Sequence, residues 1–528
     1  MKRFFKWLLP LLVLASCNKE TGSPVAPAPW RASSVRTEGA ATLRQVTLGK
    51  HLDSPYLVEN VRRAYEAVYP TRSGIRVEPT DQYVRFLPAG PEDLARLEET
   101  DIDLFDYPLD YEILSDGDWY HDPSLPEDRI TWQYAVVPVG FAFPEGIPYE
   151  VLGKCCFPGS ASLTRAAGEA DWDAVERAAF EMTGNGDLLE SGTRASKTRP
   201  EGRITIVDTG TSGRKTVGVS GVKVTANTLL KTSSAYTDAK GNYSLSAKFS
   251  AKPHYHLKFK NTLGFKIGLN LLLVQASSSS LGKGPAQGLD VTVDASSDGT
   301  LWRRCVVNNA AYDYYVMCRE SGIAVPVSNL RFWTLNFMNP SCALMLHHGA
   351  MVDTDLASKY LGVTRLVLAF FSPDITIGCK GKIGDYAGLY FDTVHEMAHA
   401  SHFQKAGAAY WNRFARYVLF SYFATTSPYG TGNGENAGLC EVAEMWAYYL
   451  ENALYKDRYG KEHHAGESHW FRPQILTEVE KAGVTRAQIC AALGQDVQDA
   501  SAFCKSLQET CPAKKSQIAS AFSKYGKK

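Results

Sequence analysis

Five consecutive residues, His395-Glu396-Met397-Ala398-His399, bring together two imidazoles and a carboxylate, the side chains that a catalytic metal site needs. On an α-helix, residues four positions apart lie on one face, so both histidines can bind a single ion. The pattern His-Glu-x-x-His also places a glutamate beside the first ligand, where it can act as general base toward a metal-activated water. The spacing therefore predicts a zinc site with His395 and His399 as ligands and Glu396 as catalyst.

The flanking sequence favours the helix that this arrangement requires. Apolar side chains recur at Phe391, Val394, Ala398 and Phe403, and no proline or glycine interrupts residues 389–405. The alternative interpretation is a surface helix that carries two unrelated histidines.

A catalytic zinc site needs a third protein ligand and an open fourth position for water. His402 lies on the same helix, but a straight helix carries it about 10 Å along the axis from His395, which makes it a poor third ligand. The extended motif with a histidine six residues past His399 is absent, because Lys405 occupies that position. The third ligand must therefore come from elsewhere in the chain.

A second predicted helix, residues 438–451, supplies glutamates one turn apart at Glu441 and Glu444. Its segment Glu444-Met445-Trp446-Ala447 resembles the gluzincin branch of zinc metallopeptidases, where the third ligand is a glutamate followed by any residue, an aromatic and alanine. The resemblance implies Glu444 as the third ligand. Glu441, one turn earlier, is then the expected hydrogen-bond partner of a ligand histidine. The alternative is that both glutamates are solvated positions of an amphipathic helix.

The same resemblance carries expectations about the surrounding domain. It implies one Zn²⁺ per chain, and an edge strand before the metal-binding helix against which an extended substrate can pair. Two β-rich runs, residues 365–371 and 374–378, stand in that place. The family also often uses a tyrosine or histidine to stabilise the oxyanion; Tyr422, Tyr429 and His469 are candidates, and the sequence selects none of them.

The N-terminus predicts export and lipid anchoring. Residues 1–6 are basic, residues 7–15 form an apolar run too short to span a bilayer, and Leu14-Ala15-Ser16-Cys17 follows directly. This segment resembles a bacterial lipobox, which implies a signal peptide over residues 1–17, lipidation of Cys17 and a flexible tether over residues 18–35. Asn18 after the cysteine, by analogy with such lipoproteins, favours the outer membrane of a Gram-negative cell envelope. The alternative is an ordinary secreted chain.

Composition narrows the classes of partner. Lysine plus arginine equals aspartate plus glutamate at 56 each, and this balance argues against nucleic acid, whose phosphates require a basic face. Beyond Cys17 ten cysteines remain, an even number that makes disulfides an expectation for an exported chain. None has the paired spacing of a structural zinc site, so we count one metal.

At 528 residues the chain is expected to be multidomain, because it is too long for a single core. Residues 36–200 predict an α+β module plus a linker, with helices at 57–68 and 91–98 and a strand at 82–87. An acidic, aromatic stretch at residues 101–111 is interpreted as a packing or partner surface, or as part of an inhibitory prodomain.

Residues 201–297 predict an all-β unit of short alternating strands. Gly221-Val222-Lys223-Val224, followed by a run from Thr237 to Leu245, resembles the carboxypeptidase regulatory-like, transthyretin-like sandwich, which in its family is a non-catalytic module. Residues 298–528 change to long aromatic-rich helices, including 301–317 and 410–423, and predict a mainly α, zincin-like α+β domain.

Together these features predict a membrane-anchored zinc metallopeptidase that acts on a peptide or protein substrate, with the lipid anchor as its only membrane contact. The main alternative is a surface lipoprotein that binds glycans or proteins through a degenerate zincin domain. A third possibility is a latent protease whose first module covers the cleft. The intact Glu396 favours the enzyme, because a purely binding domain has no use for a general base.

Overall fold

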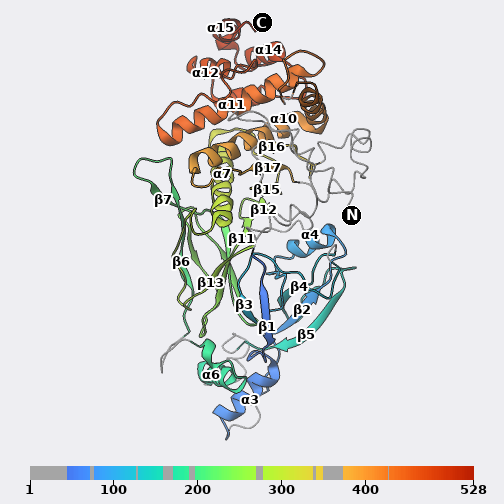
Figure 1. The fold of residues 1–528 in the computed structure, drawn as a ribbon, viewed down its shortest axis with the longest axis vertical. Coiled ribbons are helices and arrows are strands. Elements are labelled where there is room, and N and C mark those ends of the chain that lie inside the picture. The colour runs from blue at the N-terminus through green and yellow to red at the C-terminus, as the bar shows by residue number, and fades with distance from the viewer. Residues whose placement is uncertain are drawn as a thin grey trace.

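The computed structural model describes residues 44–71, 76–126, 129–157, 170–189, 197–268, 278–336, 341–348, 373–425, 427 and 429–527. The described molecule is elongated (Figure 1). Helices from the C-terminal part of the chain form one end, sheets occupy the middle, and two helices of the N-terminal part form the other end. Sheets and helices of several kinds thus confirm the coarse expectation of a multidomain chain with a mostly helical C-terminal region.

The N-terminal part is an α+β unit, as expected. Its strands form a β1–β3 pair and a three-stranded antiparallel sheet in the order β4-β2-β5. The bounds are β1 Thr47–His51, β2 Asp81–Phe86, β3 Tyr111–Ser115, β4 Gln133–Pro138 and β5 Tyr149–Cys155. The helices are α3 Val58–Val68, α4 Pro91–Glu99 and α6 Trp172–Met182. The predicted helices at 57–68 and 91–98 and the strand at 82–87 are confirmed within one residue at each end.

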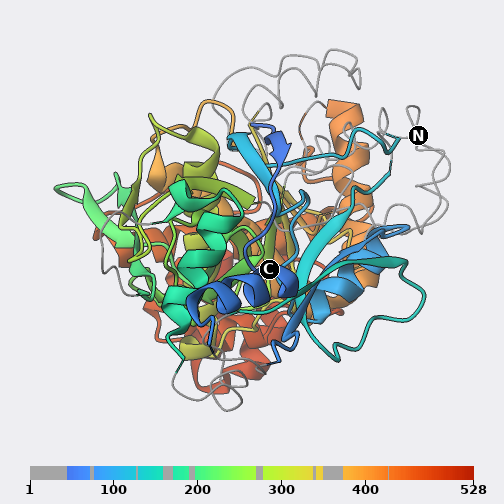
Figure 2. The ribbon, with the colours of Figure 1, turned by 90° about the horizontal axis from the view of Figure 1, so that it is seen from below.

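Alternation along β2 explains how this unit is layered. Val84 and Phe86 point to one face and pack with Leu94 and Leu97 of α4, whereas Tyr83 points to the opposite face and joins a different core. The paired helices α3 and α6 carry a further small core at the far end, and Figure 2, which looks at the molecule from that end, shows them side by side.

The acidic stretch 101–111 is a packing surface inside the chain. It faces strands β8 Val222–Thr228 and β11 His254–Asn261 of the next unit. Asp103 forms an ion pair of 2.7 Å with Lys223. Tyr107 Oη lies 3.0 Å from Nε2 of the buried His256. This ion pair and this hydrogen bond hold the N-terminal unit against the unit that contains β8 and β11.

The middle unit consists of two sheets that enclose a core, and the short strands expected within residues 201–297 are present. The smaller sheet has the order β10-β6-β14, with β7 also on β6; the larger contains β12-β11-β8-β9, with β13 on β11. The remaining bounds are β6 Glu201–Asp208, β7 Lys215–Gly218, β9 Lys231–Tyr236, β10 Asn242–Ser244, β12 Lys266–Gly268, β13 Ser278–Lys283 and β14 Val291–Val293.

A tight turn at residues 238–242 connects β9 to β10. The Asp238 carboxylate accepts hydrogen bonds from the backbone N–H groups of Lys240 and Asn242. Gly241 follows with φ of 83°, and a Cβ there would lie 2.0 Å from the carbonyl oxygen of Ile204. Only glycine fits this position, so the turn residues seen in the sequence set the geometry of the β9–β10 connection.

The larger sheet continues past the predicted boundary at residues 297 and 298. Strand β12 pairs in parallel with β15 Arg331–Leu335, which pairs in parallel with β17 Ile375–Gly378, and β16 Cys342–Ala343 pairs antiparallel at the end. A single core also runs from Ile204 to Phe522. The middle and C-terminal units are therefore joined by one sheet and one core.

Helices cover this end of the sheet. The bounds are α7 Gly299–Ser321, α10 Tyr386–Thr425, α11 Ala437–Tyr459, α12 Gln474–Lys481, α13 Arg486–Ala491, α14 Ala500–Thr510 and α15 Lys515–Lys524. The predicted helix at 301–317 is part of α7, whose N-terminus is capped by the Asp298 carboxylate. Both α10 and α11 lie across the end of the molecule above β16 and β17 (Figure 1).

Of the two runs expected to supply an edge strand, residues 365–371 lie outside the described residues. Residues 375–378 form β17, but this strand lies between β15 and β16. The expectation of an edge strand at 374–378 is therefore wrong, because the short β16 occupies the outer side of β17.

The expectation of disulfides is not met. All ten cysteines from Cys155 to Cys511 are buried, and none of these described residues forms a disulfide. Burial raises the pKa of the Cys305 thiol well above its usual value, so this group behaves as a small apolar side chain.

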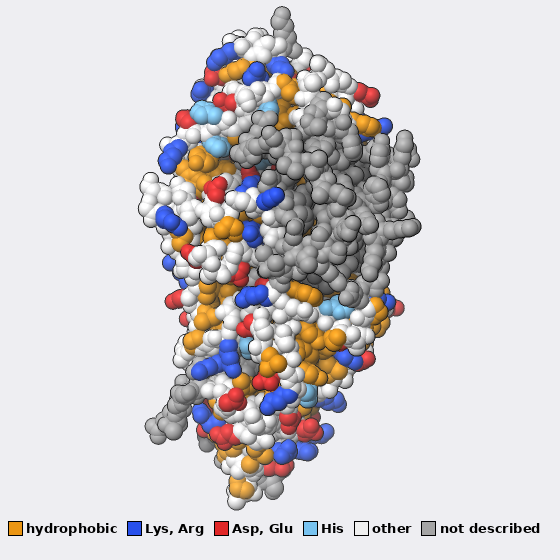
Figure 3. Space-filling view, in the orientation of Figure 1, with side chains coloured by type: hydrophobic (Ala, Val, Ile, Leu, Met, Phe, Trp, Pro, Cys, Tyr) orange, Lys and Arg blue, Asp and Glu red, His pale blue; other side chains and the backbone are white. Residues whose placement is uncertain are grey.

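The signal peptide, Cys17 and the tether lie outside the described residues. Among the helices that the structure does describe, none has the length and apolar character needed to cross a bilayer. On the face in Figure 3 basic and acidic side chains are interspersed, in keeping with their equal numbers of 56 each.

Candidate metal centre

The first half of α10 presents His395 and His399 on one face, as the spacing predicts. Both side chains are almost fully buried, with exposed fractions of 2% and 1%. Apolar neighbours on the same helix, including Leu389 and Val394, belong to the main core and hold the helix against the sheet. The helix therefore brings two imidazoles into a closed, water-poor environment.

A sharp turn in α10 closes the environment of His399. Gly407 has φ of 78° and ψ of 171°, and the chain turns back at this residue into the helix predicted at 410–423. Trp411 lies 12 positions after His399, which would separate them by about 18 Å on a straight helix. Instead their ring centroids are 5.9 Å apart, and Phe414 lies 6.0 Å from the same imidazole.

The third member of the group, Glu444, comes from α11. This helix is fixed against α10 on both sides of Glu444: Trp446 Nε1 donates to the carbonyl of Ala398 at 3.0 Å, and Tyr410 Oη donates to the carbonyl of Leu439 at 3.1 Å. Along the first half of α10, His395 lies by Glu451, Ala398 by Trp446 and His399 by Glu444, so this half crosses α11 antiparallel. These bonds set the position from which the Glu444 carboxylate reaches the histidines.

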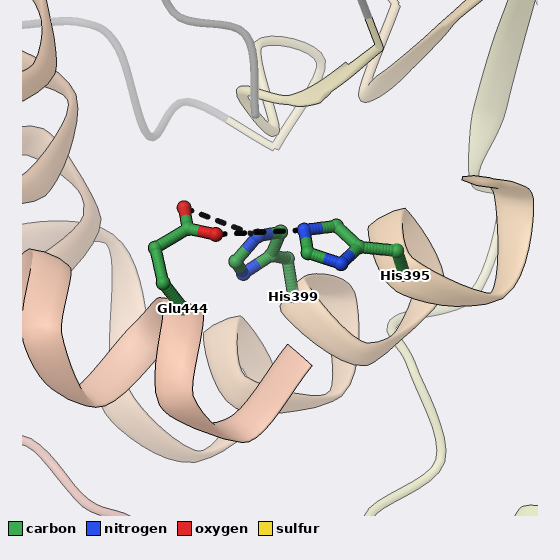
Figure 4. Close-up of side chains that lie close together, drawn as sticks. All are labelled: His395, His399 and Glu444. Atoms are coloured by element: carbon green, nitrogen blue, oxygen red, sulfur yellow. Dashed lines mark ion pairs between the residues drawn. The ribbon is translucent and has the colours of Figure 1, made fainter. Parts of the chain in front are cut away.

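The three side chains converge (Figure 4). The two carboxylate oxygens of Glu444 lie 3.5 Å from His395 Nε2 and 3.5 Å from His399 Nε2. One ligand atom from each residue lies within 4.8 Å of the other two. In a tetrahedral site with bonds of about 2.1 Å, ligand atoms stand about 3.4 Å apart, close to the two nitrogen–oxygen separations of 3.5 Å. The buried His395, His399 and Glu444 group could thus hold a metal ion, as the sequence predicts.

Electrostatics also favour a cation at this position. Burial alone would lower the pKa of His395, but hydrogen bonds to Glu444 and Glu451 outweigh it and raise that pKa to about 10. Burial likewise opposes ionisation of Glu444, yet the two histidines hold the pKa of this carboxyl well below its usual value. Burial lowers the pKa of His399 despite the attraction of Glu444. His395 thus carries a proton between the carboxylates of Glu444 and Glu451, and a metal ion bound to the group would replace that positive charge.

The hydrogen-bond partner of His395 is Glu451, a residue that the sequence analysis did not select. Its Oε2 lies 3.1 Å from His395 Nδ1, and its Oε1 lies 3.2 Å from Nε2 of His463. Glu451 is fully buried and follows Glu444 by seven residues, which places both on the same face of α11. That spacing is the signal by which the sequence could have indicated it.

Glu441 does not have the role expected for it. Its Oε2 accepts the backbone N–H of Ala500 at 3.0 Å, at the start of α14, and its Oε1 forms an ion pair with Lys527. The expectation was wrong because α10 and α11 are antiparallel. The carboxylate that meets His395, which precedes His399, must follow Glu444 along α11 rather than precede it.

Glu396 and His402 lie beside the group without joining it. Glu396 is buried, with 1% exposure, directly after the first histidine on α10. Burial, and next the nearby Glu396 carboxylate, raise the pKa of the Cys342 thiol on β16. His402 packs against the rings of Tyr410 and Trp411, and burial lowers its pKa to about 3. The prediction that His402 is not the third ligand agrees with this placement.

A tyrosine that the sequence analysis did not name lies against the group. The Tyr448 ring centroid is 4.4 Å from that of His395, and its hydroxyl lies 2.9 Å from the hydroxyl of Tyr429. Tyr429 in turn packs on His469, with centroids 4.8 Å apart. Two of the three oxyanion candidates, Tyr429 and His469, are therefore near the group through Tyr448, whereas the side chain of Tyr422 is outside the described set.

No protein-family model matches this sequence, and no curated protein matches it either.

Proposed function

We propose that this chain is a zinc metallopeptidase of the gluzincin type. The observation that carries the proposal is the buried group of His395, His399 and Glu444 at separations suited to a tetrahedral ion. Two histidines and one glutamate, with one open position for water, are a ligand set of catalytic zinc sites. The adjacent Glu396 adds a carboxylate that such a site uses as a general base.

Each residue then has a definite task. His395 and His399 would hold the ion through Nε2, and Glu444 would hold it through its carboxylate. Zinc at this position would supply a Lewis acid and a water of pKa about 7. Glu396 would serve as the general base that takes a proton from an attacking water and delivers it to the leaving amine of a peptide. Tyr429, Tyr448 and His469 are the residues from which an oxyanion donor is drawn.

The proposal also covers the cellular location of the chain and the role of residues 201–297. The mature chain is anchored through a lipid on Cys17 in a Gram-negative cell envelope, with residues 201–297 as a transthyretin-like, non-catalytic unit. In the latent-protease alternative the first module covers the cleft. Contacts of that module with the rest of the chain include Asp103 with Lys223 and Tyr107 with His256, which lie on the β-sandwich sheet.

The decisive experiment is elemental analysis of the untagged mature chain beside Glu444→Ala and Glu396→Gln. We expect about one zinc per wild-type chain, loss of zinc in Glu444→Ala because one ligand is missing, and retention in Glu396→Gln. Peptide-library cleavage is then expected for the wild type and not for Glu396→Gln.

Two results would contradict the proposal. Zinc content that is indifferent to Glu444 would remove the third ligand. A zinc-loaded wild-type chain that cleaves no member of a broad peptide library would favour the alternative of a glycan- or protein-binding lipoprotein.

A further inference from the structure

Behind the metal group, a loop returns from the end of α11 and packs on the same helix. Helix α11 ends at Gly460, which has φ of 65° and lets the chain reverse. The returning segment is fixed at Ala465, whose N–H and carbonyl both bond the Asn452 amide at 2.9 Å. This pair of hydrogen bonds sets the register of the loop against α11.

Two further contacts place the loop directly behind His395. Gly466 has φ of 72°, and a Cβ there would lie 2.4 Å from the ring of Tyr448, which itself packs on His395. His463 stacks on Tyr455 with centroids 4.3 Å apart and planes inclined by 13°. The loop is thus built to hold one histidine in a fixed orientation.

That histidine completes a chain of side chains from the surface to the metal group. His463, whose side chain is 32% exposed, lies with Nε2 3.2 Å from Glu451 Oε1. The other oxygen of Glu451 lies 3.1 Å from His395 Nδ1. Glu451 itself has no measurable exposure, so a hydrogen bond at each oxygen decides how its carboxylate is oriented.

We propose that His463 is a positioning residue of the metal centre, acting through Glu451 to hold the His395 imidazole with Nδ1–H donated inward and Nε2 directed at the metal. The physical reason is that an imidazole binds a metal through only one nitrogen, and the hydrogen bond at the other nitrogen fixes its tautomer and ring angle. Loss of the donor at Oε1 removes one of the hydrogen bonds that orient the Glu451 carboxylate, and this weakens the restraint on the His395 ring. The inference rests on the proposed zinc site.

The test is zinc affinity, measured by competition with a chromophoric chelator, of the full mature chain and four variants. Removal of a carboxylate that orients a metal ligand weakens metal binding by about 10- to 100-fold, which is the expected effect of Glu451→Gln. For His463→Ala, one bond further away, we expect the low end of that range, about 10-fold. His463→Gln retains an N–H donor toward Glu451 and should recover most of the affinity.

His464→Ala is the matched control. Its side chain is 66% exposed, it neighbours His463, and its partner is Glu467 rather than Glu451. We expect wild-type zinc affinity for this variant. Thermal unfolding of the metal-free proteins, recorded in parallel, separates positioning from folding.

The outcomes distinguish the inference from the proposed function. A wild-type chain that binds no zinc would overturn both. Wild-type affinity in His463→Ala would overturn only the inference. So would an affinity loss that follows a fall in melting temperature and that His463→Gln does not restore, because the role of His463 would then be structural.

Discussion

The buried carboxylate of Glu176 offers a sharp test of how the N-terminal unit is attached. Glu176 lies on α6, and its Oε1 accepts from Tyr56 Oη at 2.7 Å and from Lys231 Nζ at 3.2 Å. Its Oε2 pairs with Lys197 Nζ at 2.6 Å. Lys231 belongs to β9, so this carboxylate joins the N-terminal unit to the middle unit. We predict that Glu176→Gln weakens the attachment in a pH-dependent manner.

The magnitude follows from the pKa. Burial by itself would raise the pKa of Glu176, but Lys231, Lys197 and Tyr56 lower it to about 2, compared with an ordinary value of 4.5. A difference of about 2.5 units corresponds to about 3 kcal/mol of stability. Because the folded-state pKa is lowered, this stability is fully present above pH 4.5 and is lost as the pH falls toward about 2.

The assay is urea unfolding of wild type and Glu176→Gln between pH 7 and pH 2.5, with Glu181→Gln on the exposed side of the same helix as control. We expect Glu176→Gln to be less stable than wild type by about 3 kcal/mol at pH 7, where the two lysines lose their buried carboxylate. The gap should narrow below pH 4.5, and Glu181→Gln should follow wild type throughout. A gap that stays constant with pH, or no gap at pH 7, would refute the reasoning.

Two further predictions concern the helices that carry the metal group. Arg458 of α11 donates to the buried Asp208 of β6 at 2.9 Å and to Asp313 of α7 at 3.1 Å. Arg458→Met should lower the free energy of unfolding by about 3 kcal/mol in a denaturant titration, because Asp208 is left buried without a cation. Arg458→Lys should recover only part of this loss, since a lysine lacks the planar guanidinium fork. Trp446→Phe removes the bond to Ala398 that fixes α11 on α10, and should lower stability by about 1 kcal/mol and weaken zinc binding in a chelator competition. An unchanged zinc affinity would show that this bond does not set the position of Glu444.

The two histidines and the glutamate of the metal group differ in how far the sequence could predict them. His395 and His399 could be placed from the sequence because they are four residues apart on one helix, and helical geometry is local. Glu444 was named through its resemblance to a family motif. No local rule brings α11 against α10, so the tertiary structure alone decided that the three side chains meet.

The orienting residues show the limit of the same reasoning. Glu441 and Glu451 are both glutamates of α11, and the sequence indicated only Glu441, as the partner of a ligand histidine. The antiparallel crossing of α10 and α11 selected the latter, because it carries positions after Glu444 toward the earlier histidine of α10. The role of His463 is harder still to predict from sequence, because its contact with Glu451 depends on a reversal of the chain at Gly460.

By itself, the sequence determined the strands and helices that follow from local periodicity, the pair of histidines and the glutamate between them. The tertiary structure decided what depends on long-range packing: the sheet that passes from β12 to β15, the burial of ten cysteines without disulfides among them, and the reversal at Gly407 that brings Trp411 against His399. Periodicity acts over one or two turns of a helix, whereas these contacts join residues far apart in the chain, and their geometry exists only once the core has formed.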